Sequence, residues 1–252
     1  MNAASSNGGS FQIGLQNTRT IASRQFRGYF NSPVAYIVIC LVLPALGVLF
    51  WEPFFLMGHA SVRQMFSFLG PILALALPAI SMGLIAEERR SGTLELLLAM
   101  PVREAEVILG KYFAALGLLV VLLACTIFYP LSVAALGSID WGPVITGYFG
   151  VFLEGAALLA IGIAASSFTE NQLIAFFISA SISFGLAFII GWFLPFVPTG
   201  LPTTIAEWLS FEHHLEGMTR GVVDSRDVIY FLSISALALM LAFRALESRR
   251  WS

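Results

Sequence analysis

The sequence is poor in charge, cysteine and histidine. Only 11% of its 252 residues are charged and 58% are hydrophobic, whereas soluble domains have about 25% charged and about 45–50% apolar residues. So little polar surface excludes an ordinary soluble enzyme and a disordered chain. The net charge of −2 provides no basic surface for DNA or RNA, so no nucleic-acid partner is expected. The two cysteines, Cys40 and Cys125, both lie in apolar runs and do not indicate a disulfide framework.

Six long apolar runs account for this composition. Each can cross a membrane as a helix, because a hydrocarbon core about 30 Å thick requires about 20 helical residues. Backbone groups in lipid must pair within their own segment, and the alternation typical of a β-barrel is missing from these runs. The predicted fold class is therefore all-α integral membrane with six transmembrane helices. The predicted spans are Pro33–Trp51, Phe66–Ala86, Tyr112–Leu136, Val144–Phe168, Leu173–Val197 and Val228–Phe243.

The distribution of basic residues predicts the orientation. Ten of the 13 Lys and Arg residues lie in the N-terminal segment, the second connection and the C-terminus, and the remaining three lie in the first and fifth connections. Basic residues are enriched in cytoplasmic loops. Both chain termini are therefore expected in the cytoplasm.

The segment before the first span divides into two parts. Residues 1–14 are small and polar and are predicted to be a disordered tail. Residues 15–31 are predicted to form an amphipathic helix in the membrane interface, with docking on another protein as the alternative. Its apolar face holds Ala22, Phe26 and Phe30, and its opposite face holds Arg19 and Arg27.

The connection between the second and third spans, residues 87–111, has the most informative pattern. Gly92 is expected to end the preceding helix, and Thr93 is expected to cap a short new one. Leucines at helical spacing from Leu94 give this helix an apolar stripe, and Pro101 ends it. The alternative is a solvated interfacial loop.

This connection begins at Glu87 with the order Glu-Glu-basic-basic-Ser-Gly-Thr-Leu-Glu-Leu-Leu-Leu-x-x-Pro. That order, placed between spans two and three, resembles permease subunits of ABC-2 type transporters. Further blocks, such as Arg-Gly-Val-Val-Asp-Ser-Arg-Asp from Arg220, are similar to the gliding-motility-type branch of that family. The resemblance covers about Phe26 to Phe243.

The resemblance implies an ABC-2, type V exporter-like permease subunit in the bacterial inner membrane. It implies a dimeric transmembrane unit, a separate ABC ATPase that binds ATP and Mg, and a second membrane subunit with a large extracytoplasmic domain. The chain itself is then a non-catalytic subunit without a cofactor, and it contains no P-loop sequence. The implied organisation is a tail (1–14), an elbow helix (15–31), a permease domain (32–246) with coupling segment 87–111 and outer loop 198–227, and a C-terminal tail (247–252).

The resemblance also implies roles for individual residues. The helix around the start of the second connection is implied to couple the chain to the ATPase. The outer loop before span six is implied to contact the second membrane subunit. The implied coupling residues are Glu87, Glu88, Arg89, Gly92, Thr93, Leu94 and Glu95; the elbow residues are Arg19, Ala22, Phe26, Arg27 and Phe30; the outer-loop residues are Arg220, Asp224, Arg226 and Asp227.

Three further features leave alternatives open. Glu154 is the one ionisable residue well inside a predicted span. It makes a polar contact in a translocation path or at a dimer seam, or else its carboxyl is protonated and forms a hydrogen bond to a neighbouring helix. Small residues in span four indicate a tight helix contact, either within the chain or between two copies. The adjacent His213 and His214 point about 100° apart on a helix and do not predict a metal site. The outer loop around them is instead predicted to be a short helical lid, with ion pairs among Arg220, Asp224 and Asp227. The alternative function is a nucleotide-independent secondary carrier or channel.

Overall fold

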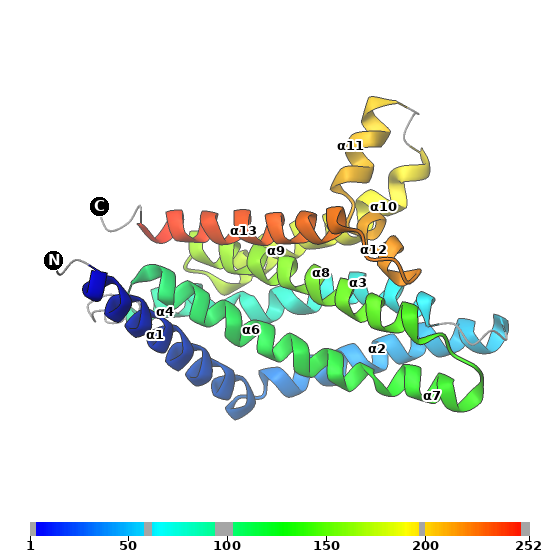
Figure 1. The fold of residues 1–252 in the computed structure, drawn as a ribbon, viewed down its shortest axis with the longest axis horizontal. Coiled ribbons are helices and arrows are strands. Elements are labelled where there is room, and N and C mark those ends of the chain that lie inside the picture. The colour runs from blue at the N-terminus through cyan, green and yellow to red at the C-terminus, as the bar shows by residue number, and fades with distance from the viewer. Residues whose placement is uncertain (1–3, 58–61, 94–102, 197–199, 248–252) are drawn as a thin grey trace.

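The computed structural model describes residues 4–57, 62–93, 103–196 and 200–247. Within these ranges all regular elements are helices. Six helical stretches are long and apolar enough to cross a membrane, which confirms the predicted fold class. They form an elongated bundle with both chain termini at one end (Figure 1). The stretches are α2 (Val34–Met57), α3 with α4 (Arg63–Ser81, Gly83–Arg90), α6 with α7 (Glu104–Thr126, Phe128–Leu136), α8 (Trp141–Phe168), α9 to η2 (Gln172–Phe184, Gly185–Ile189, Ile190–Phe193, Leu194–Phe196) and α13 (Ser225–Glu247).

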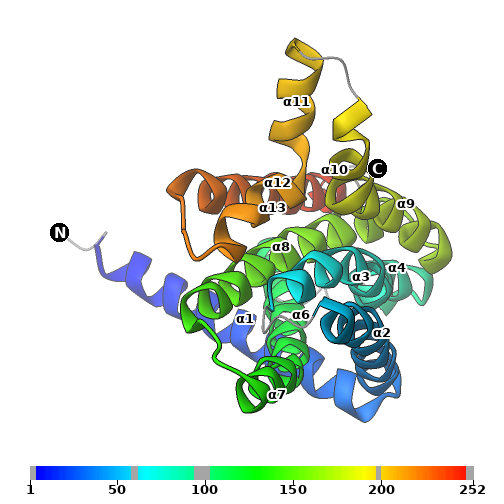
Figure 2. The ribbon, with the colours of Figure 1, turned by 90° about the vertical axis from the view of Figure 1, so that its right-hand side faces the viewer.

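Helix α8 is the centre of the bundle. Helices α3, α4, α6, α9, α12 and α13 all pack against it, and it runs through the middle of the end-on view (Figure 2). Small residues permit the close approach, because a Cβ atom at Gly162 would lie 1.8 Å from Ser81 Oγ and one at Gly155 would lie 2.6 Å from Leu119 Cδ2. The small residues of span four therefore serve contacts within this chain.

A proline interrupts the third span. Helix α6 ends at Thr126 and α7 begins at Phe128, two residues before Pro130. A proline ring clashes with the carbonyl four residues earlier, and here that carbonyl belongs to Thr126. The break is therefore a fixed consequence of the sequence.

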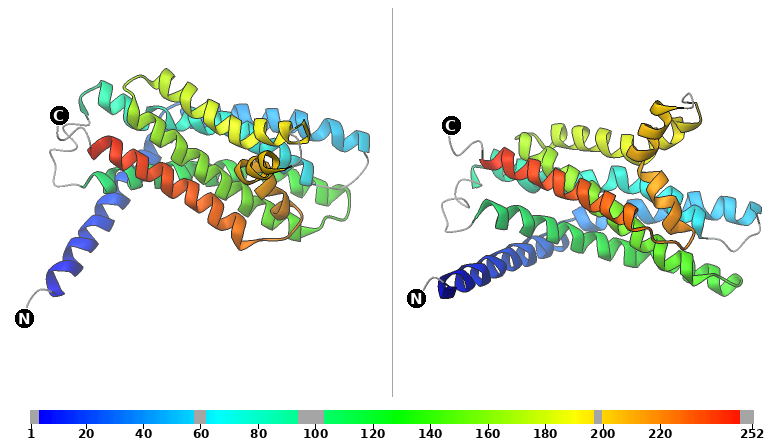
Figure 3. Two further views of the ribbon diagram at one scale, coloured as in Figure 1. Left: turned by 90° about the horizontal axis from the view of Figure 1, so that it is seen from above. Right: turned by 45° about the horizontal axis from the view of Figure 1, so that its top comes forward.

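Helix α1 (Ala4–Asn31) begins well before the predicted start at residue 15. Residues 4–14, for which composition predicted a disordered tail, belong to the helix in the structure. Once docking fixes a helix, each further residue adds one hydrogen bond, and this gain outweighs the low helix propensity of the Ser, Asn and Gly residues here. The N-terminal part of α1 projects away from the bundle (Figure 3).

The outer loop predicted over residues 198–227 is largely helical. It contains α11 (Leu201–Leu209) and α12 (Phe211–Thr219), at the end of the bundle opposite the termini (Figure 1). Helix α11 stands out from the bundle, whereas α12 packs against α8 and α3. Helix α12 therefore closes one end of the helix bundle.

Candidate functional site

The charged end of the second span is helix α4. It ends at Arg90, and Gly92 follows with a φ of 71°, a conformation that glycine adopts without steric cost. Gly92 therefore ends the helix, as predicted. Thr93 Oγ1 donates a hydrogen bond of 3.3 Å to Glu88 O, so this hydroxyl satisfies the end of α4. Residues 94–102, which include the predicted coupling residues Leu94 and Glu95, lie outside the described residues.

A buried lysine joins α4 to the third span. The Lys111 ammonium, on α6, forms an ion pair with Glu88 and donates a hydrogen bond to Leu84 O. The Lys111 side chain is 3% exposed and that of Glu88 is 32% exposed. A buried charge requires such partners, because its solvation by water is lost. The ion pair therefore fixes the end of α4 relative to α6.

A serine from α8 caps α4 from outside. The first N–H groups of a helix lack partners within the helix, and α4 restarts at Gly83 after the break at Met82. Ser166 Oγ accepts hydrogen bonds from Ile85 N (3.1 Å) and Ala86 N (3.0 Å) and donates one of 2.8 Å to Met82 O. This buried hydroxyl therefore joins the broken second span to the end of α8.

Two more coupling residues face the same neighbours. Arg89 Nη1 donates a hydrogen bond of 2.9 Å to Ser167 O at the end of α8. The carboxylate of Glu87 lies 3.3 Å, and the amide of Gln172 on α9 lies 3.5 Å, from the place that a Cβ at Gly83 would take. The end of α4 is thus bonded to α6 and α8, and α4 also packs against α9.

Replacing Ser166 by Ala is expected to destabilise the protein by about 1–2 kcal/mol, the usual effect of losing a helix cap. The change leaves the Ile85 and Ala86 amides without the hydroxyl that accepts from them. Thermal unfolding of the detergent-solubilised chain measures the loss. Ser167→Ala is the matched control, because Ser167 Oγ bonds only locally, to Ile163 O in its own helix. Equal melting temperatures for the two variants would contradict the capping role.

The amphipathic helix α1 docks on its own chain. Its Ile21 lies against Gly110 and its Phe26 against Gly117, so α1 and α6 run side by side in the same direction. Asn17 Nδ2 donates a hydrogen bond of 3.0 Å to Glu106 Oε2. Helix α6 thus covers part of the apolar face that sequence reasoning assigned to the membrane or to another protein.

The elbow residues divide as their spacing predicts. Phe26 and Phe30 meet edge to face with ring centroids 5.2 Å apart, and Ala22 is half-buried. Arg19 and Arg27 are exposed on the opposite face. The amphipathic character of this helix is therefore confirmed, while its place relative to a membrane stays a prediction.

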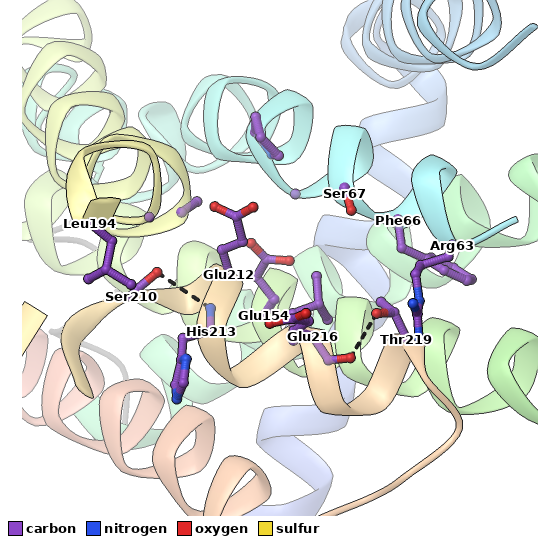
Figure 4. Close-up of a pocket in the computed structure, with 15 residues that line it drawn as sticks. Arg63, Phe66, Ser67, Glu154, Leu194, Ser210, Glu212, His213, Glu216 and Thr219 are labelled. Carbon is purple, nitrogen blue, oxygen red and sulfur yellow. Dashed lines mark hydrogen bonds between the residues drawn. The ribbon is translucent and has the colours of Figure 1, made fainter. Parts of the chain in front are cut away.

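Glu154 faces a cavity within the chain. It is 1% exposed and lines a cavity of about 330 Å³ between α3, α8, α10 and α12 (Figure 4). Glu212, on α12, lines the same cavity, and burial raises the pKa of its carboxyl above the ordinary value. Sequence reasoning found Glu154 from its depth in a span but missed Glu212, which is distant along the chain.

The outer-loop residues are placed differently from the prediction. Ion pairs among Arg220, Asp224 and Asp227 were expected, but each residue has another partner. A four-residue spacing favours Glu216 as the partner of Arg220 on one helix, and an aspartate before a helix accepts from its first N–H groups. The observed contacts are an ion pair of Arg220 with Glu216, a hydrogen bond of 2.8 Å between His214 Nδ1 and Asp227 Oδ1, and one of 2.9 Å from Arg226 N to Asp224 Oδ1.

The two adjacent histidines diverge as their spacing predicts. His214 is buried and stacks on Tyr230 with ring centroids 3.8 Å apart, while His213 is exposed. In the part of the chain that the structure describes, no three His, Cys, Asp or Glu residues come close enough to hold a metal ion.

Sequence reasoning missed the residues that hold the site together. Lys111 and Ser166 were not among the predicted coupling residues, although both carry a signal. Lys111 is a lone cation at the start of an apolar run, and Ser166 precedes Ser167 at the end of an otherwise apolar span. Buried polar side chains at such places need partners, which only the tertiary structure identifies.

The chain was compared with known proteins. The model of the ABC-2 family transporter protein matches residues 6–246, nearly the whole chain. A search among curated proteins finds no significant match. Membrane subunits of this family are generally non-catalytic permeases that work with an ABC ATPase. With six helices able to cross a membrane and a family match over almost its full length, the chain belongs to the ABC-2 family of transporter proteins.

Proposed function

We propose that this chain is the permease subunit through which a separate ABC ATPase drives export, or mechanical work, across the bacterial inner membrane. The ATPase binds the ATP and Mg, and both termini of the permease lie on its side of the membrane. The observation that carries the proposal is the network that bonds the end of α4 to α6 and α8, with α9 packed against α4.

The network suits the transmission of force. A push on the segment after α4 reaches α6 through Lys111 and reaches α8 through Ser166 and Arg89. Buried, fully bonded polar groups hold helices in one arrangement, so displacement of α4 moves its neighbours with it. The family resemblance supplies the source of the push, the coupling residues from Glu87 to Glu95 seated on the ATPase.

We further propose that the transmembrane unit is a dimer and that a second membrane subunit with a large extracytoplasmic domain accompanies it. Support comes from the blocks that resemble the gliding-motility-type branch. Arg220, Asp224 and Arg226 are exposed and can contact this subunit, although Arg220 also pairs with Glu216. The partly buried Asp227 is bonded to His214.

Purification of the tagged full-length chain from its native membrane in mild detergent tests the proposal. We expect a stoichiometric ATPase with a P-loop sequence, together with a second membrane subunit. A homo-oligomer that stays intact without any nucleotide-binding partner would contradict the proposal and favour the nucleotide-independent carrier or channel.

Replacing both Glu88 and Glu95 by Ala is expected to lower the amount of ATPase recovered with the chain, or the work done per ATP, without preventing membrane insertion. Both residues lie in the proposed coupling segment. Glu207→Ala is the control, because Glu207 lies on α11, at the end of the bundle opposite α4. Normal ATPase recovery and normal coupled activity in the Glu88/Glu95 double variant would refute the coupling role.

A further inference from the structure

We propose that the cavity in front of Glu154 and Glu212 is a binding site for an ammonium group attached to an apolar body. The inference deepens the proposed function, since it assigns a ligand class to the permease. It rests on the unpartnered acid at the base of the cavity, on the glycines that fix both acids in the cavity wall and on the charge balance of the lining residues.

The buried acid lacks a full set of partners. Glu154 is 1% exposed, and its Oε2 atom is buried with no hydrogen-bond partner in the structure. Burial disfavours the charged form of such a carboxyl, and a positive group next to it would stabilise that form. Glu154 lines the cavity (Figure 4), and a ligand there can supply that group.

Glycines of the cavity wall let both acids approach the helix backbone closely. A Cβ at Gly70 would lie 2.9 Å from Glu154 Oε1, and a Cβ at Gly191 would lie 2.2 Å from Glu212 Oε2. Both glycines line the cavity. A larger residue at either position would displace the carboxylate, so the two glycines fix where the acids lie in the cavity wall.

The charge of the lining favours a single positive group. Glu216 also lines the cavity, but it forms an ion pair with Arg220, which is not one of the lining residues. The lining then retains two acids, Glu154 and Glu212, and one arginine, Arg63, which leaves one acid in excess. His213 also lines the cavity, and it is not an acidic residue. One monovalent cation therefore balances the cavity.

The size and walls of the cavity favour an organic cation over a bare ion. Its volume of about 330 Å³ is at the lower end for small-molecule sites. Apolar side chains form much of the wall, and Phe66 is an aromatic residue among them. The apolar lining residues are Phe66, Pro71, Ala187, Leu194 and Leu215.

Thermal unfolding of the full-length chain in dodecyl maltoside, with added phenethylammonium, tests the inference. A ligand that binds only the folded state raises the melting temperature. We expect a rise with phenethylammonium but none with the neutral 2-phenylethanol or the anionic phenylacetate. The apparent affinity is expected to fall about tenfold in Glu154→Gln, since a hydrogen bond to a charged group is lost.

Matched variants keep the test decisive if Glu154→Gln unfolds. Glu212→Gln changes an exposed residue of the cavity and should also weaken binding, whereas Glu207→Gln, on α11 outside the cavity, should not. Binding that ignores ligand charge, or that survives both cavity substitutions, would overturn the inference, as would no binding at all.

A second arm identifies the source of the ammonium group. If phosphatidylethanolamine, but not phosphatidylglycerol, displaces the probe, the ligand is a lipid headgroup; if neither does, it is a soluble amine. Because the assay uses the chain without an ATPase, failure to bind the amine leaves the ATPase partnership untouched, and that partnership is tested separately by co-purification.

Discussion

Replacing Glu88 by Gln is expected to lower the free energy of unfolding by about 1–3 kcal/mol. The change leaves the Lys111 ammonium buried with Leu84 O as its remaining partner. Breaking one side of a fully buried ion pair costs about 3–5 kcal/mol, and the partial exposure of Glu88 reduces that cost because water screens its charge. Thermal unfolding in detergent measures the stability. The work done per ATP by the assembled transporter is expected to fall as well.

A double-mutant cycle of Glu88→Gln and Lys111→Met tests whether the ion pair between these residues contributes to stability. Lys111→Met removes the buried charge itself and fills its volume with a flexible apolar side chain, so it should destabilise less than Glu88→Gln. The double variant should melt close to Lys111→Met and above Glu88→Gln. Additive effects of the two substitutions would show that the charges do not interact.

Gly162→Ala is expected to cost about 1–3 kcal/mol of stability, the usual effect of overpacking a close contact. The new Cβ would lie 1.8 Å from Ser81 Oγ and 2.7 Å from Ser81 Cβ, so rotation of the hydroxyl alone does not relieve the clash. Helices α3 and α8 must move apart, next to the break at Met82. The melting temperature and the monodispersity of the solubilised protein measure the effect.

Gly185→Ala is the matched control for this substitution. It lies in the fifth span, and a Cβ there meets no heavy atom within 4 Å. Alanine also has a higher helix propensity than glycine, so this variant should be neutral or slightly stabilised. If Gly162→Ala melts as high as Gly185→Ala, then α3 and α8 do not approach as closely as the structure shows.

The spans could be predicted from the sequence because burial in lipid leaves a direct trace in composition. A run of about 20 apolar residues is a helix in any arrangement of its neighbours, and Gly92 ends α4 for a local reason that its residue type reveals. The amphipathic pattern of α1 likewise predicted which of its faces is buried. Its partner did not follow from that pattern, because Gly110 and Gly117 on α6 lie about 90 residues away along the chain.

The sites proved harder to predict, because they depend on pairs of residues that are distant in sequence. Ser166 reaches α4 across 80 residues, and Glu154 meets Glu212 only after α12 folds back on α8. A single sequence shows that a polar residue lies in an apolar run, but it does not show what that residue faces. The predicted ion pairs of the outer loop were wrong for another reason, since Arg220 pairs locally with Glu216, four residues before it, and only Asp227 meets a more distant partner, His214.

The cap that Ser166 provides has a consequence for biosynthesis. Ile85 leaves the ribosome 81 residues before Ser166, which corresponds to roughly 4–16 s at the usual rate of translation. During that interval the second span enters the membrane with two amides still awaiting their acceptor. Because the break at Met82 lies near the end of the span, beside the charged residues of α4, water can hold these amides meanwhile. The unpaired amides of the nascent chain therefore lie where water can bond to them. They gain their final acceptor, Ser166, when the fourth span is made.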